Sequence, residues 1–119
     1  MDSSYKILLV DDELMLLELM KKYLTDQGYS ITTCSNGSEA LRIINKADFS
    51  VVISDLRMGE VNGFTVLRHY KERSPHGIGI LYTGTGRPDA ASHPNVDVFL
   101  AKPFELFQLR DLLSQLLEE

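Results

Sequence analysis

Two patterns of hydrophobic positions alternate along this chain. Short apolar runs rich in valine, isoleucine and leucine favour strands, whereas longer segments repeat apolar residues at helical spacing. The short runs predict strands at residues 6–10, 30–34, 50–54, 78–82 and 96–100. The longer segments predict helices at residues 13–27, 40–47, 62–73 and 104–117.

The helix stops are marked by glycine and proline. Gly28 follows the first predicted helix, as expected of a residue that ends a helix in a left-handed conformation. The segment 87–95 has the weakest pattern, because Pro88 is tolerated only in a first helical turn and Pro94 stops any helix shortly afterwards. We therefore expect the fourth helix of the chain, in this segment, to be short or irregular.

Strands that alternate with helices over short connections indicate an α/β fold, a doubly wound parallel sheet of five strands with helices on both faces. The chain has 119 residues, 44% hydrophobic and 24% charged, which is typical of a globular domain with a proper core. No internal repeat, linker or low-complexity tract interrupts the pattern. We expect residues 1–119 to form a single domain.

Charge and cysteine content narrow the function classes. The net charge of −5 argues against a nucleic-acid-binding surface. The single cysteine, Cys34, excludes an intrachain disulfide and a multi-cysteine metal site, and it is expected in the core. No signal peptide and no apolar run of membrane-spanning length is visible, so we expect a cytoplasmic protein without a membrane partner.

Chemically active side chains stand where four predicted strands end. The residues are Asp11 with Asp12, Asp55, Thr83 and Lys102. In open parallel sheets the carboxyl ends of the strands form the edge at which ligands bind. Like-charged carboxylates about 4 Å apart repel by roughly 4 kcal/mol at an effective dielectric near 20, so three of them favour a bound cation. Oxygen ligands of this kind suit Mg²⁺.

The same edge carries the parts needed for phosphoryl transfer. Mg²⁺ can hold a phosphoryl oxygen, and the ammonium of Lys102 and the hydroxyl of Thr83 can stabilise charge on the transferring group. The nucleophile would be a carboxylate, which gives an acyl phosphate. Asp55, at the end of the central apolar strand, is the best candidate.

Taken together, these residues resemble the receiver domain of two-component response regulators over essentially the whole chain. The resemblance rests on Asp11-Asp12-Glu13, on Asp55-Leu56-Arg57-Met58 with Gly63 further on, on Thr83, and on Phe99-Leu100-Ala101-Lys102-Pro103-Phe104. It implies the flavodoxin-like strand order 2-1-3-4-5. It also implies a cis Lys102–Pro103 bond, a geometry uncommon for X–Pro at large.

The resemblance assigns a role to each site residue. Asp55 is similar to the phospho-acceptor, and Lys102 to the lysine that pairs with the phosphoryl oxygens. Asp12 resembles a direct Mg²⁺ ligand, Asp11 a ligand acting through water, and the backbone carbonyl of Arg57 the third protein ligand. The switch residues of the family, a hydroxyl that turns toward the phosphoryl group and an aromatic that moves inward with it, match Thr83 and Phe99.

Two departures from the family pattern concern the loops. Gly59 stands where the family usually has proline, so the loop after Asp55 is expected to be more mobile. The connection between Thr83 and Lys102 is also a few residues shorter than usual. The shortfall falls in segment 87–95, where the family has a helix that helps to form its output and dimerisation surface.

The resemblance predicts a domain that phosphorylates and dephosphorylates itself and is not an enzyme acting on another substrate. Its partner would be a sensor histidine kinase or a histidine phosphotransfer protein, with an effector domain or a second copy for output. Two alternatives stay open on the sequence alone. One is an interaction module of the same fold that works without phosphorylation, and the other is a small flavodoxin-like cofactor binder, which the acidic edge opposes.

Overall fold

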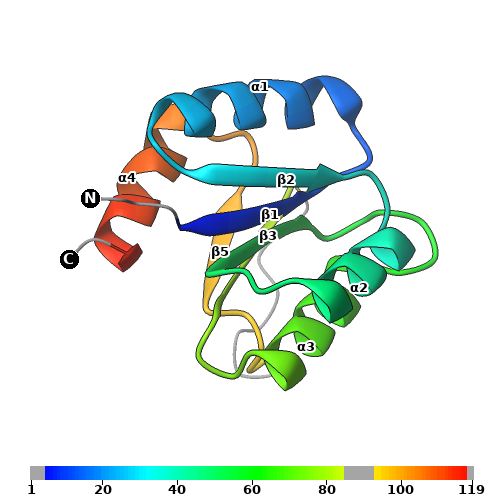
Figure 1. The fold of residues 1–119 in the computed structure, drawn as a ribbon. Coiled ribbons are helices and arrows are strands. Elements are labelled where there is room, and N and C mark those ends of the chain that lie inside the picture. Colours follow the sequence, from blue (N-terminus) through cyan, green and yellow to red (C-terminus); the bar gives the residue numbers. More distant parts are fainter. Residues whose placement is uncertain (1–4, 85–92, 118–119) are drawn as a thin grey trace.

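The computed structural model describes residues 5–84 and 93–117. Its centre is a five-stranded parallel sheet in the order β2-β1-β3-β4-β5, as predicted (Figure 1). The strands are β1 (Lys6–Val10), β2 (Ser30–Cys34), β3 (Val51–Asp55), β4 (Ile78–Thr83) and β5 (Val98–Ala101). The helices of the described residues are α1 (Leu14–Asp26), α2 (Gly37–Lys46), α3 (Gly63–Arg73) and α4 (Leu106–Leu117).

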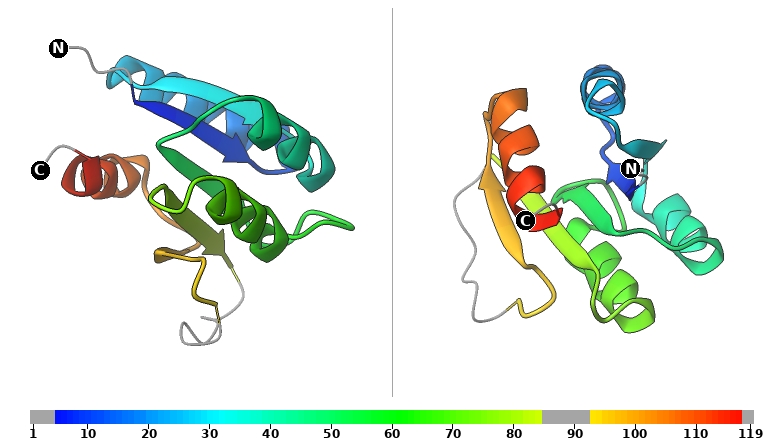
Figure 2. Two further views of the ribbon diagram at one scale, coloured as in Figure 1. Left: turned by 60° about the horizontal axis from the view of Figure 1, so that its bottom comes forward. Right: turned by 60° about the vertical axis from the view of Figure 1, so that its left-hand side comes forward.

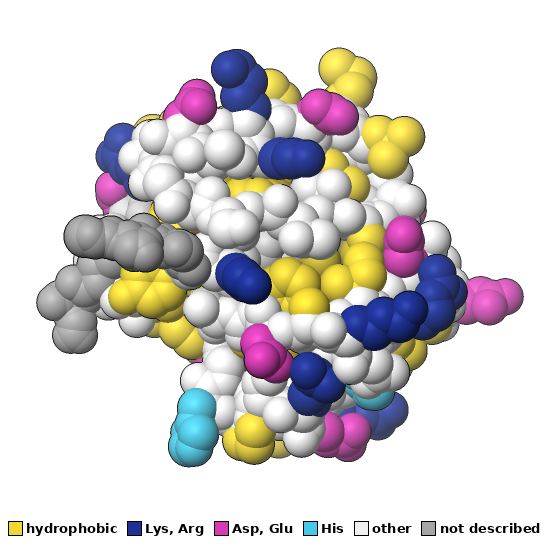
Figure 3. Space-filling model, in the orientation of Figure 1, with side chains coloured by type: hydrophobic (Ala, Val, Ile, Leu, Met, Phe, Trp, Pro, Cys, Tyr) yellow, Lys and Arg dark blue, Asp and Glu magenta, His cyan; other side chains and the backbone are white. Residues whose placement is uncertain are grey.

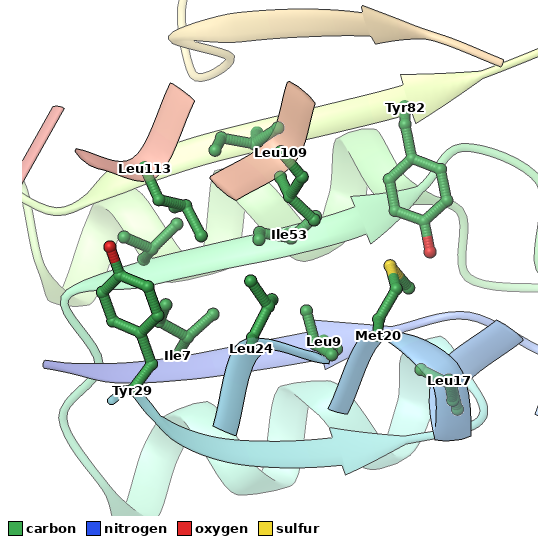
Figure 4. Packing of buried hydrophobic residues seen from close by; sticks show 12 residues of the cluster. Ile7, Leu9, Leu17, Met20, Leu24, Tyr29, Ile53, Tyr82, Leu109 and Leu113 are labelled. Atoms are coloured by element: carbon green, nitrogen blue, oxygen red, sulfur yellow. The ribbon is translucent and has the colours of Figure 1, made fainter. Parts of the chain in front are cut away.

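The helices cover the two faces of the sheet in pairs. Helices α1 and α4 lie on one face, and α2 and α3 lie on the other (Figure 2). Alternation along β1 supplies both layers, because Ile7 and Leu9 pack under α1 and α4 whereas Leu8 and Val10 pack toward α2 and α3. Figure 4 shows the first of these layers, with side chains from the strands meeting those of α1 and α4. The central strands are buried on both faces, which explains their unbroken apolar runs.

Most predicted boundaries lie within one or two residues of the observed ones, and two differences have a physical reason. Strand β5 begins at Val98, later than predicted, because the Val96 amide closes a turn by donating to the His93 carbonyl. Helix α4 begins at Leu106 instead of residue 104. Phe104 precedes this helix, and its ring packs edge-on against the ring of Tyr82 at 5.6 Å between centroids.

Several local predictions are confirmed. Gly28 has φ of +103° directly after the α1 region, the conformation expected of the residue that ends this helix. Cys34 is buried, and burial raises the pKa of its thiol to about 12. The predicted irregular segment 87–95 lies outside the described residues except for 93–95, which lie in and around a turn. Within the described ranges, no helix is long and apolar enough to cross a membrane.

Candidate functional site

The register and the alternation of the strands bring four side chains to one end of the sheet. Asp55 is the register partner of Tyr82 on the neighbouring strand β4. Asp11 follows Val10 and therefore points to the same face as Leu9, under α1 and α4. Lys102 follows β5, where its amide donates to the Thr83 carbonyl at 3.0 Å. The side chains of Asp11, Asp55, Tyr82 and Lys102 consequently meet at the carboxyl ends of β1, β3, β4 and β5.

Three carboxylates form the acidic part of this site. Oxygens of Asp11, Asp12 and Asp55 all lie within 4.8 Å of one another. The three side chains differ in burial. Asp11 is fully buried, Asp55 is buried with 9% of its surface exposed, and Asp12 is exposed. An all-oxygen set with one exposed member suits a hard cation that keeps several waters, as Mg²⁺ does. The residues present thus fit the predicted Mg²⁺ ion.

Lys102 supplies the positive charge of the cluster. Its Nζ lies 3.4 Å from Oδ2 of Asp55 and 3.9 Å from Oδ2 of Asp11, and its side chain is about one quarter exposed. A half-buried ammonium between two buried carboxylates offsets part of their mutual repulsion. The Lys102–Pro103 peptide bond is cis, as the resemblance implied.

Tyr82 is the member of this site that the sequence reasoning missed. Its hydroxyl donates a hydrogen bond of 2.5 Å to Oδ2 of Asp11, while the backbone amide of Glu13 donates to Oδ1 at 2.8 Å. The Tyr82 ring lies 4.9 Å from the ammonium of Lys102. Alternation could have found it, since the residue before Thr83 must point to the same face as the side chain of Asp55.

Burial and charge shift the acidity of two groups in the cluster. Desolvation by burial, and secondly the carboxylate of Asp11, raise the pKa of Asp55 above its ordinary value, although Lys102 pulls it down. Burial and the same carboxylate raise the pKa of the Tyr82 hydroxyl far above its ordinary value. The hydroxyl of Tyr82 therefore stays protonated and acts as a donor at neutral pH.

The raised pKa of Asp55 predicts that ionisation of this carboxyl lowers the free energy of unfolding of the metal-free protein. Between the ordinary carboxyl pKa of 3.8 and the higher folded value, the native state binds more protons than the unfolded state, so the free energy of unfolding falls as pH rises. Asp55→Asn should remove this loss. At pH 7 we expect the variant to be more stable by about 1 to 3 kcal/mol, because like charges about 5 Å apart repel by roughly 3 kcal/mol before Lys102 offsets part of it.

Urea denaturation in EDTA at several pH values measures this gain. Subtracting the wild-type curve from that of Asp55→Asn isolates the contribution of Asp55 from that of all other groups. The gain should be absent below pH 3.8 and should grow above it. A gain in stability that is absent at pH 7, or that does not change with pH, contradicts the prediction that the ionised Asp55 carboxylate destabilises the fold.

The two predicted switch residues lie on the other side of the sheet. Thr83 follows Leu81 and Tyr82 on β4 and is buried, with 6% of its surface exposed. Phe99 is the register partner of Leu81 on β5, and its half-buried ring packs against the core layer under α2 and α3. Alternation places Thr83, Leu81 and Phe99 on one face. Thr83 thus lies at the sheet edge where the acidic cluster is, on the face to which Phe99 belongs.

The loop between β3 and α3 carries Arg57, the predicted source of a backbone ligand, whose side chain is exposed. Gly59 has φ of +85°, a conformation closed to proline, so the residue that the resemblance led us to expect here would not fit this backbone. The loop returns at Gly63, where an added Cβ would lie 2.4 Å from the Asp55 carbonyl oxygen. This close approach explains why a glycine starts α3 directly behind Asp55.

Comparison with known proteins agrees with this geometry. The family model described as the response regulator receiver domain matches residues 7–114. The chain is 38% identical over 116 residues to the transcriptional regulatory protein GlrR of Escherichia coli (strain K12). This alignment covers 95% of this chain and 26% of GlrR. The chain therefore spans about a quarter of the length of that relative.

Two solved structures share the fold closely. A response regulator receiver protein from Sinorhizobium medicae WSM419 has a TM-score of 0.88 at 33% identity, over 98% of this chain and 96% of that chain. The response regulator protein TrrA from Thermotoga maritima, in complex with Mg²⁺-BeF, has a TM-score of 0.85 at 32% identity, over 95% and 99%. The chain belongs to the response regulator receiver domain family of two-component systems.

Proposed function

We propose that Asp55 accepts a phosphoryl group from the phosphohistidine of a sensor histidine kinase or histidine phosphotransfer protein, with Mg²⁺, and that this event switches the domain's conformation. The observation that carries the proposal is the position of Lys102, whose Nζ lies 3.4 Å from Asp55 Oδ2 within a cluster of three carboxylates. This arrangement supports the proposal, because phosphoryl transfer to a carboxylate needs a nucleophile, a cation site and a positive charge close together.

Each side chain of the site has its own role in the proposed phosphoryl transfer. A carboxylate oxygen of Asp55 bonds to phosphorus, the phosphorus–nitrogen bond breaks, and the leaving imidazole keeps the electron pair and takes a proton from solvent water. Lys102 stabilises the negative charge on the phosphoryl oxygens. Asp12 would ligate Mg²⁺ directly, Asp11 through water and Arg57 through its carbonyl. The ion, when bound, neutralises charge on the transferring group.

The phosphoryl group would then bias a conformational equilibrium. It adds about two negative charges and several acceptor oxygens at the edge where Thr83 ends β4. The hydroxyl of Thr83 would turn toward the new acceptors, and Phe99 would follow into the space beneath. A pre-existing equilibrium needs only such a differential contact to shift. The domain would phosphorylate and dephosphorylate itself without acting on a separate substrate.

A surface beside the site suits a docking protein that brings the phosphohistidine. Helix α1 exposes Leu14, Met15 and Leu19, and hydrophobic side chains stand out at the end of the molecule where α1 begins (Figure 3). A groove of about 610 Å³, lined partly by α1, by Lys102 and by Phe104, opens next to them. Exposed apolar side chains next to a reactive site are typical of an interaction surface.

The output belongs to the whole protein. Because the chain spans about a quarter of the transcriptional regulator GlrR, we propose that the receiver controls a transcriptional effector region in a longer protein, and nucleic acid would be bound by that region. The net charge of −5 assigns no such role to the receiver itself. A second copy of the receiver is the other proposed partner in output.

Incubation with acetyl phosphate tests the proposal without a cognate kinase. Intact-mass spectrometry of the wild-type chain in Mg²⁺ should show one phosphoryl adduct, and EDTA should prevent its formation. Peptide mapping should place the adduct at Asp55, with the lability to hydroxylamine expected of an acyl phosphate. A folded protein that gives no adduct under these conditions would instead support an interaction module that works without phosphorylation.

A further inference from the structure

The buried hydroxyl of Tyr82 holds one oxygen of the most buried acid in the site. Oδ2 of Asp11 accepts from this hydroxyl at 2.5 Å and faces the Lys102 ammonium at 3.9 Å. Oδ1 of Asp11 accepts from the Glu13 amide at 2.8 Å. Asp11 is fully buried, so these groups take the place of water around its charge. Both of its oxygens are therefore engaged before any metal arrives.

The ring of Tyr82 acts on the second charged partner. The Lys102 ammonium lies over the ring, 4.9 Å from its centroid, where the face of an aromatic ring attracts a cation. The ring itself is fully buried and makes a T-shaped contact with the ring of Phe104. Figure 4 shows it at the arrowhead ends of the strands, with the hydroxyl directed away from β4 and toward β1. One rigid side chain thus contacts Asp11 through its hydroxyl and Lys102 through the face of its ring.

We propose that Tyr82 is a positioning residue of the phospho-acceptor site, which acts through two neighbours. Its hydroxyl engages Oδ2 of Asp11, so that this carboxylate does not draw Lys102 to itself and would hold Mg²⁺ only through water. Its ring keeps the ammonium of Lys102 turned toward Asp55. This inference deepens the proposed function and rests on it.

Tyr82→Phe isolates the hydroxyl, because it keeps the ring and the packing. Without the hydroxyl, the Asp11 carboxylate of the metal-free cluster loses a hydrogen-bond donor. Binding of a cation then stabilises the carboxylates more than it does in the wild type. We expect the dissociation constant for Mg²⁺, measured by titration calorimetry, to fall about fivefold. Lys102, drawn toward the unpaired Oδ2 of Asp11, should leave Asp55, and the phosphorylation rate at saturating Mg²⁺ should fall about tenfold.

Tyr70→Phe is the matched control. Tyr70 is an equally buried tyrosine whose hydroxyl donates to the Phe49 carbonyl at 2.6 Å, on the opposite face of the sheet. Its loss should lower the thermal midpoint and leave both Mg²⁺ affinity and phosphorylation rate unchanged. Tighter Mg²⁺ binding together with slower phosphorylation is therefore a signature that loss of stability alone does not produce.

A double-mutant cycle tests whether Tyr82 acts through Asp11. In an Asp11→Asn background, Tyr82→Phe should no longer tighten Mg²⁺ binding, because the carboxylate that it exposes is absent. Equal Mg²⁺ affinities of the wild-type and Tyr82→Phe proteins, or an unchanged effect in the Asp11→Asn background, overturn the inference. A wild-type protein that binds no Mg²⁺ and gains no phosphoryl group instead overturns the proposed function, so the two failures are distinguishable.

Discussion

Asp55→Asn protein is expected to gain no phosphoryl group from acetyl phosphate in Mg²⁺, under conditions that label the wild-type chain fully. An amide oxygen is a far weaker nucleophile than a carboxylate and cannot form the acyl phosphate. The substitution is nearly isosteric, and the site keeps Lys102, Asp11 and Asp12 in place. The loss should therefore reflect chemistry and not unfolding. Intact-mass spectrometry measures it directly.

Asp48→Asn is the control for this experiment. Asp48 is an exposed aspartate that pairs with Arg73, far in the fold from the strand ends that form the site. It carries the same change of charge and mass, and it should be labelled like the wild type. An adduct on the Asp55→Asn protein of equal yield would move the acceptor to another carboxylate, and peptide mapping would then compare Asp12 first.

The sheet and its acidic edge could be predicted from the sequence because strong local signals agreed with one another. Four apolar runs each end in a polar side chain, at Asp11, Asp55, Thr83 and Lys102. Parallel strands bring such ends together at one edge, so pattern alone implied proximity. The structure confirms that three of these side chains meet within a few ångströms, namely Asp11, Asp55 and Lys102. The buried Thr83 lies at the same edge, on the opposite face.

Other features depend on tertiary packing that the linear pattern does not contain. The hydrophobic pattern alone does not show which of Asp11 and Asp12 is buried, and the structure turns only Asp11 into the core, where the Tyr82 hydroxyl reaches it. Tyr82 itself lies inside an apolar strand and looks like an ordinary core residue until the register pairs it with Asp55. Gly59 has a φ of +85°, a backbone conformation that excludes proline and that residue type alone does not reveal, whereas the expected mobility of its loop stays a prediction. Burial distinguishes Asp11, register distinguishes Tyr82, and backbone conformation distinguishes Gly59.

Lys102→Met is expected to slow phosphorylation by acetyl phosphate about a hundredfold or more, with Mg²⁺ still bound. Removing one group that stabilises developing charge in a buried site typically slows a reaction by about 10² to 10³. The same change leaves Asp11 and Asp55 without their ammonium, so Mg²⁺ should bind at least as tightly as in the wild type. Time courses by intact-mass spectrometry at saturating Mg²⁺, with calorimetric titration of Mg²⁺, separate the two effects.

Lys71→Met is the control for the slower phosphorylation expected of Lys102→Met. Lys71 is another partly buried lysine, paired at 2.8 Å with Asp97 near the start of β5 and distant from the acidic edge. Its removal should lower stability without changing the phosphorylation rate of the folded protein. Lys102→Arg keeps the charge but not the compact ammonium, so it should recover only part of the rate. If Lys102→Met is phosphorylated as fast as Lys71→Met, the ammonium beside Asp55 stabilises the resting cluster of carboxylates and not the transferring phosphoryl group.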